Sequence, residues 1–146
     1  MRALALFSAA LVVALVSCKS HKAVPLDKTE AADLPQAATL QKLREMLPTA
    51  EFVYCYAPKW TLKPTDISTW TVENDAVTIE HGKGNSLRLG FADITDVRLD
   101  ASGKYYYVKV FTSVQPERDR PQFDFLFRIE ERAKEVGELL LAMKKR

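Results

Sequence analysis

The sequence predicts an α+β domain, built as a small antiparallel β-barrel or strongly bent sheet of six to seven strands, with a C-terminal capping helix and a short N-terminal helix. Between residues 51 and 129, apolar and polar side chains alternate with a period of two, and turn-forming residues separate the runs. Residues 36–48 and 130–146 instead place apolar residues three or four positions apart, which is typical of amphipathic helices. A length of 146 residues fits one such domain with a small extension.

The composition excludes several functional classes. The chain has 21 Lys and Arg residues against 19 Asp and Glu residues, a formal net charge of +2, and 47% hydrophobic residues. These values are not those of a disordered tail or of a strongly basic nucleic-acid binder. Two cysteines and two histidines leave little material for a disulfide framework, a metal site or a histidine-based catalytic centre. We therefore expect no nucleic-acid partner, no cofactor and no metal.

Residues 1–17 are predicted to be a signal peptide. Arg2 is followed by an apolar run, residues 3–16, in which Ser8 is the only polar residue. At about 1.5 Å per helical residue the run spans about 21 Å, which is shorter than the roughly 30 Å hydrocarbon core of a bilayer. A permanent membrane-spanning helix is therefore disfavoured.

The quartet that ends this run, Leu15-Val16-Ser17-Cys18, resembles the lipobox of bacterial lipoproteins. The resemblance implies that the sulfur of Cys18 receives a diacylglycerol, that the signal is cut just before Cys18, and that the new amino group is also acylated. Two or three acyl chains, such as palmitate, anchor a protein stably, whereas one chain binds only reversibly. Lys19 stands where an inner-membrane retention signal has an aspartate, which favours the outer membrane, facing the periplasm. The alternative is a conventional cleaved signal, with Cys18 as an unmodified thiol.

Residues 18–35 are polar and charged, contain two prolines, and show no apolar periodicity. We predict a flexible tether with a span of about 20 to 25 Å, enough to hold a small domain clear of the lipid head groups. The globular domain is then expected over residues 36–146, with a helix at 36–48, β structure at 51–129 and a helix at 130–146.

The strand region begins with residues 52–56, in which Phe52, Tyr54 and Tyr56 share one face. Because the opposite face is also apolar, we expect this strand to be covered on both sides. Two prolines flank residues 59–63, so residues 59–66 are predicted to form a loop or an irregular edge. Further strands and hairpins are expected up to residue 129. The last helix begins with acidic and ends with basic residues, as the helix dipole favours.

Three segments carry a second resemblance: residues 91–97 (FADITDV), residues 105–110 (YYYVKV), and residues 125–127 (FLF) running into the last helix. Together with the order of hairpins they resemble the pleckstrin-homology-like fold over about residues 66–146. The resemblance implies a scaffold that binds lipids, peptides or proteins and is seldom catalytic. The first hairpin offers only Lys83 and Arg88 as basic residues, with Glu80 adjacent, so we do not expect a phosphate pocket there.

The strand over residues 104–114 has an apolar face left over once the core is filled, formed by Tyr105, Tyr107 and Phe111. We favour coverage of this face by the helix over residues 36–47. The alternative is an exposed aromatic patch for a partner protein or an acyl chain, since large exposed apolar areas mark interaction sites.

The sequence thus predicts a membrane-tethered, non-catalytic binding or protein-interaction module of the bacterial cell envelope. Its partners would be the membrane, through acyl chains on Cys18, and an envelope protein or an apolar ligand. The alternative function is a carrier or sensor of a small apolar ligand or lipid, held in a cavity between sheet and helix. An enzyme is not expected, because the sequence shows no paired carboxylates at a recognisable motif and no metal cluster. For Cys55 the only candidate base is His81, which has no evident orienting carboxylate beyond Glu80 next to it in sequence.

Overall fold

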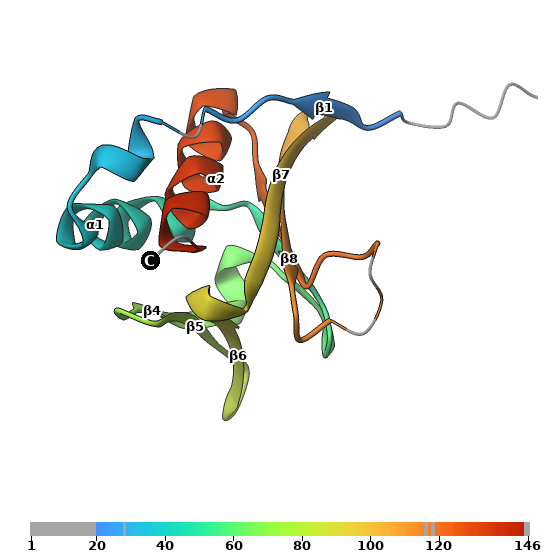
Figure 1. Ribbon diagram of the computed structural model, residues 1–146. Helices are drawn as coiled ribbons and strands as arrows, with labels where there is room; N and C mark the ends of the chain where they lie inside the picture. The colour runs from blue at the N-terminus through green and yellow to red at the C-terminus, as the bar shows by residue number, and fades with distance from the viewer. Residues whose placement is uncertain (1–19, 28, 116, 118, 145–146) are drawn as a thin grey trace, which may run out of the picture.

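The computed structural model describes residues 20–27, 29–115, 117 and 119–144. The predicted signal peptide and Cys18 lie outside these residues. The described chain contains a six-stranded and a three-stranded antiparallel sheet, two α-helices and four short 3-10 helices (Figure 1). The expected α+β class with a C-terminal helix is confirmed. None of the described α-helices is long and apolar enough to span a membrane.

The larger sheet has the strand order β1-β7-β8-β9-β2-β3, and the smaller sheet has the order β4-β5-β6. The larger sheet comprises β1 (Lys22–Val24), β2 (Phe52–Tyr56), β3 (Lys59–Leu62), β7 (Ile94–Ser102), β8 (Tyr105–Thr112) and β9 (Phe123–Phe127). The smaller sheet comprises β4 (Ile67–Val72), β5 (Ala76–His81) and β6 (Asn85–Gly90). Within the described residues, no hydrogen-bonded ladder joins the two sheets into a closed barrel.

Short 3-10 helices mark the places where the chain changes direction. They are η1 (Ala31–Asp33), η2 (Leu47–Thr49), η3 (Pro64–Asp66) and η4 (Phe91–Asp93). Helix η3 leads from the larger sheet into the smaller one, and η4 leads back. Gly82 and Gly84, in the turn between β5 and β6, have φ values of 57° and 78°, a region that glycine enters without a steric cost.

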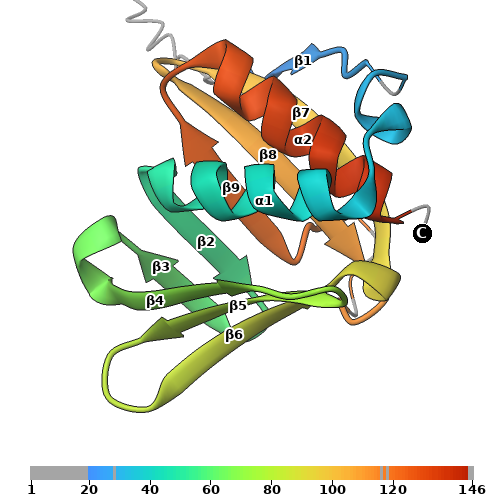
Figure 2. The same cartoon turned by 90° about the vertical axis from the view of Figure 1, so that its left-hand side faces the viewer.

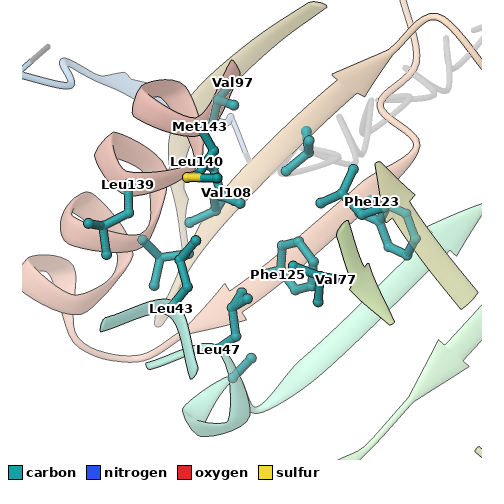
Figure 3. Packing of buried hydrophobic residues seen from close by; sticks show 14 of the residues in the cluster. Leu43, Leu47, Val77, Val97, Val108, Phe123, Phe125, Leu139, Leu140 and Met143 are labelled. Atoms are coloured by element: carbon teal, nitrogen blue, oxygen red, sulfur yellow. The ribbon is translucent and has the colours of Figure 1, made fainter. Parts of the chain in front are cut away.

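Both α-helices lie on one face of the larger sheet (Figure 2). Helix α2 (Glu130–Lys144) packs on β7, β8 and β9, while α1 (Gln36–Met46) packs on α2 and β4. The core between them contains Leu43 and Leu47 from the α1 region, Leu140 from α2, and Val108 and Phe125 from the sheet (Figure 3). Val77 and Ile79 of the smaller sheet belong to the same core.

The expectation that the helix over residues 36–47 covers Tyr105 and Tyr107 is wrong. Val108 and Val110 are buried on the side of β8 that faces α2, so Tyr105 and Tyr107, three residues and one residue before Val108, point to the opposite side. Helix α1 lies on the helical side of the sheet and buries Leu40 and Leu43 in the core. The apolar stripe of α1 packs against α2 and the smaller sheet. The sequence pattern alone did not identify these partners.

The expected flexible tether is partly ordered. Residues Lys22–Val24 form β1 and pair with Leu99 to Ala101 of β7. Farther on, Leu26 packs beside Gly137 of α2, and the backbone N–H of Asp27 donates a 2.9 Å hydrogen bond to Glu138 Oε1. This segment shows no periodicity because its order comes from partners distant in sequence, namely the edge of β7 and a glycine in α2.

The expected loop over residues 59–66 is also partly wrong, because residues Lys59–Leu62 form β3. This strand pairs with all but the first residue of β2 and forms one edge of the larger sheet. Pro58 lies in the turn before it and Pro64 follows it, so neither proline interrupts the ladder. Strands β1 and β3 bring the total among the described residues to nine, against the six to seven expected.

Candidate functional site

The face of the larger sheet opposite α1 and α2 carries a group of aromatic side chains, which we call the outer face. Its aromatic members are Phe52, Tyr54 and Tyr56 of β2 and Tyr105, Tyr107 and Phe111 of β8. Strand β9 lies between β2 and β8 and places Asp124 beside Tyr54 and Lys109, and Leu126 beside Phe52 and Tyr107. All of these aromatic side chains except Phe111 are partly exposed to solvent.

One end of the outer face is organised around Tyr105. The ring of Phe52 meets Tyr105 edge-on at a centroid distance of 5.9 Å, and Phe52 stacks on Tyr54 at 6.3 Å. Two cations flank the same tyrosine, because Lys104 Nζ lies 5.4 Å and the guanidinium of Arg128 lies 5.7 Å from its ring centroid. Edge-to-face aromatic pairs and cation–π contacts of this kind limit the rotation of these side chains, so the surface that they form has a defined shape.

Phe111 contributes little to that surface. It is 8% exposed, and the guanidinium of Arg98 lies 4.5 Å above its ring. The three residues predicted as an interaction patch, Tyr105, Tyr107 and Phe111, therefore share a face as expected, but only the two tyrosines are accessible.

A buried carboxylate lies in the middle of the outer face. Asp124 is only 2% exposed, and Tyr56 Oη donates a 2.7 Å hydrogen bond to its Oδ2 atom. Its other oxygen, Oδ1, is buried without a hydrogen-bond partner among the described residues. Burial raises the pKa of Asp124 above its usual value, because the charged form loses hydration. Burial, followed by the hydrogen bond to Asp124, likewise raises the pKa of Tyr56.

Charged groups border this carboxylate on the β7 side. Lys109 Nζ lies 3.8 Å from Asp100 Oδ2, and His21 Nδ1 lies 3.9 Å from the same oxygen. The ring of His21 meets Tyr107 edge-on at 5.1 Å. His21, which precedes β1, thus contributes to the outer face. Exposed tyrosines bordered by charged groups are typical of a protein-binding surface.

A shallow groove of about 450 Å³ opens at the Tyr105 end of the outer face. It is lined by Pro48, Thr49, Ala50, Glu51, Phe52, Lys63, Pro64, Thr65, Tyr105 and Arg128. Arg128 and Glu51, which both line the groove, form an ion pair of 2.8 Å. The groove therefore combines an aromatic wall with a charged rim.

The remaining candidates show no reactive arrangement among the described residues. Burial raises the pKa of the Cys55 thiol, which makes it a poor nucleophile at neutral pH. His81 is buried, with the ring of Trp60 at 4.5 Å. Arg88 forms a 3.0 Å ion pair with Asp75. No group of three or more His, Cys, Asp or Glu side chains in this part of the chain is placed to hold a metal ion.

Sequence reasoning missed several members of the outer face. The alternation that places Phe52, Tyr54 and Tyr56 on one face was visible, but we expected that face to be covered. Asp124 occupies a polar position of an alternating strand, which ordinarily points to solvent. That tyrosines from β2 and β8 enclose it follows from strand order, which the local sequence does not report.

Comparison of the chain with protein-family models, with curated proteins and with solved structures finds no match.

Proposed function

We propose that this protein is a lipid-anchored, non-catalytic binding module of the bacterial cell envelope, and that its outer face binds a partner protein. The observation that carries the proposal is the position of the helices. Helix α2 packs on one side of the larger sheet and α1 packs on α2 on that same side (Figure 2), while the other side keeps partly exposed aromatic rings around Asp124.

The composition of the outer face supports a protein partner. Tyrosine and arginine are enriched at the centres of protein interfaces, where an aromatic ring buries a large area and its hydroxyl group forms hydrogen bonds. Tyr54, Tyr105 and Tyr107 offer both features, and the neighbouring strands hold them in position. A rigid surface of this kind loses little side-chain entropy on binding.

The membrane anchor is the second part of the proposal. Acyl chains on Cys18 would confine the module to the membrane surface and raise its effective concentration for a membrane-bound partner. Lys19 after the cysteine favours the outer membrane, with the domain in the periplasm. The supporting observations are sequence features: the apolar run over residues 3–16 and the quartet that ends in Cys18.

For the scaffold itself, we propose a strongly bent β arrangement similar to the pleckstrin-homology-like fold. Two features support it. Side chains from both sheets and from α2 share one core, and α2 follows β9 after only two residues. Such a scaffold leaves one sheet face free for ligands while the helix completes the core.

The alternative function, a carrier or sensor of an apolar ligand, has less support. The space between the larger sheet and α2 is filled by Val108, Val136 and Leu140, each with no exposed surface. The groove beside Tyr105 is the feature such a ligand would use, and it is shallow and open to solvent. Detergent-free extraction followed by mass analysis of bound lipids distinguishes the two functions, because only a carrier retains a ligand in fixed ratio to the protein.

Site-specific photo-crosslinking in living cells tests the proposed binding face. A photoreactive phenylalanine derivative replaces Tyr107, whose size and shape it approximates, and in a matched control it replaces Lys83 in the β5–β6 turn. We expect a covalent adduct of one defined mass from position 107, reduced by Tyr54→Ala, and none from position 83. Equal labelling at both positions, or no adduct at position 107, would contradict the proposal.

A further inference from the structure

We propose that residues 20–27, here called the strap, hold the domain directly against the lipid surface, with the β7–β8 turn at the membrane. The surface that faces the lipid then comprises Lys22, Lys104, Tyr105, Arg128 and Ile129, which we call the lipid-facing end. Tyr105 lies at the boundary between this end and the rest of the outer face, where Tyr54 and Tyr107 remain available to the partner protein. This inference rests on the proposed acylation of Cys18. It adds which end of the domain contacts the membrane and replaces a long, flexible connection with a short one.

The first argument is the length of chain between anchor and domain. β1 begins at Lys22, four residues after Cys18, and its first residue pairs with Ala101 near the end of β7. An extended chain spans at most about 3.5 Å per residue, so four residues reach about 14 Å. The sheet end that carries Ala101 and the β7–β8 turn therefore lies within about 14 Å of an acylated Cys18.

The second argument is that the strap has specific partners beyond β7. Leu26 lies against Gly137, at the one position in α2 where the helix has no side chain to displace it. The N–H of Asp27 bonds to Glu138, and His21 contacts both Tyr107 and Asp100. Releasing the strap would break these contacts together with the β1–β7 ladder.

The third argument is the chemistry of the lipid-facing end. Lys22 and Lys104 are exposed, and neither forms an ion pair with another described residue. Tyr105 lies between Lys104 and Arg128, and Ile129 is 47% exposed. Tyrosine and basic side chains are the usual anchors at a membrane interface, and each basic residue near an anionic surface contributes about 1 kcal/mol.

Two acidic residues near this end form ion pairs with basic residues. Glu51 forms a 2.8 Å ion pair with Arg128, and Glu130 forms a 2.9 Å ion pair with Lys134. Lys22 and Lys104 thus supply the positive charge available to anionic head groups. The β5–β6 turn lies at the opposite end of the molecule in both views (Figures 1 and 2), which provides a reference point far from the proposed contact.

Energy transfer to labelled lipid tests the orientation. The acylated full chain is placed in vesicles of phosphatidylethanolamine and phosphatidylglycerol that contain an acceptor dye on the head groups. A donor dye is attached at Thr49→Cys, which lines the groove beside Tyr105, or at Lys83→Cys in the β5–β6 turn. Cys55 stays in place, because it is buried and burial raises its pKa, so it resists labelling.

We expect several-fold stronger transfer from position 49 than from position 83. Leu26→Asp should release the strap and bring the two values together, while Ala32→Asp adds the same charge at an exposed site and should preserve the difference. Gly137→Leu is a second release variant, for the case that Leu26→Asp fails to fold. Its side chain would displace Leu26 from α2.

Equal transfer from both positions in the acylated parent, or an unchanged difference in both release variants, would overturn the inference while leaving acylation and the outer face unaffected. Intact mass of the same sample reports acylation separately. An unacylated chain would overturn the proposed anchor and this inference together.

Discussion

The side chain of Leu26 occupies the space that a side chain at Gly137 would need: a Cβ built on Gly137 would lie 3.1 Å from both Cδ atoms of Leu26. Glycine inside a helix costs about 1 kcal/mol relative to alanine. The glycine thus lowers the stability of α2 but allows a segment more than a hundred residues earlier to pack on it. This relationship joins the expected tether to the globular domain.

A pair of substitutions measures this contact. In the wild-type chain, Gly137→Ala should give little gain or a loss of stability, because the new methyl group crowds Leu26. In a Leu26→Ala background the same change should stabilise the protein by about 1 kcal/mol, since only the helix preference of alanine remains. Chemical denaturation of the four chains checks the expected reversal. An equal gain in both backgrounds would show that Leu26 does not lie on α2 in solution.

The unfolding free energy of the Asp124→Asn variant, relative to that of the wild type, should increase as the pH rises. Burial raises the pKa of Asp124, so its neutral form is favoured in the folded state. The stabilisation that protonated Asp124 gives the folded wild-type protein is fully present below the ordinary aspartate pKa of about 3.9. It is lost as the pH rises through the raised pKa. Asparagine does not ionise, and groups distant from position 124 titrate alike in both chains.

Urea denaturation at pH 3 and pH 7 measures this effect. The difference in unfolding free energy, Asp124→Asn minus wild type, should increase between these pH values by an amount on the order of 1 kcal/mol. A difference that stays constant, or that falls as the pH rises, would show that the carboxylate is better hydrated than its burial indicates.

Tyr56→Phe should destabilise the protein by about 1 to 2 kcal/mol, because it removes the hydrogen bond to Asp124 Oδ2 and leaves both carboxylate oxygens unpartnered among the described residues. The same change should further raise the pKa of Asp124, since that hydrogen bond favours the ionised form. Carboxyl chemical shifts followed by NMR against pH report the pKa directly. Tyr56→Phe in an Asp124→Asn chain is the control and should cost less, because the lost hydrogen bond is then between neutral groups.

The fold class was predictable because its signal is local. The alternation over residues 123–129 and the helical spacing after residue 130 each reside in one short segment, and β9 and α2 follow them. β1 and β3 were missed because edge strands are short and polar and owe their order to a neighbouring strand. The position of α1 was likewise undetermined, since an apolar stripe shows that a helix is covered but not by what.

Part of the outer face could be predicted from the sequence, again because its signal is local to one strand. Tyr105 and Tyr107 share a face of one strand, which a period of two reveals. Their neighbours Phe52 and Tyr54 come from a strand about fifty residues away, and the burial of Asp124 depends on the order β8-β9-β2. Sequence periodicity assigns a residue to a face, but strand order decides what that residue meets there.

Cys18→Ala should move the protein from the membrane fraction to the soluble fraction of the envelope, because position 18 then has no thiol to carry acyl chains. The fold should be unaffected, since the described domain begins after this position. Fractionation followed by immunoblotting, with circular dichroism of the purified variant, checks both statements. Membrane attachment that persists without Cys18 would mean that something other than a lipid anchor holds the protein.

Intact mass spectrometry of the native protein extracted from membranes is the most direct test of lipid anchoring, on which the account as a whole depends. The account predicts a chain that begins at Cys18 and carries the mass of two or three acyl chains. An unmodified chain cut at another position would contradict it, and the protein would then be a secreted domain without a lipid anchor.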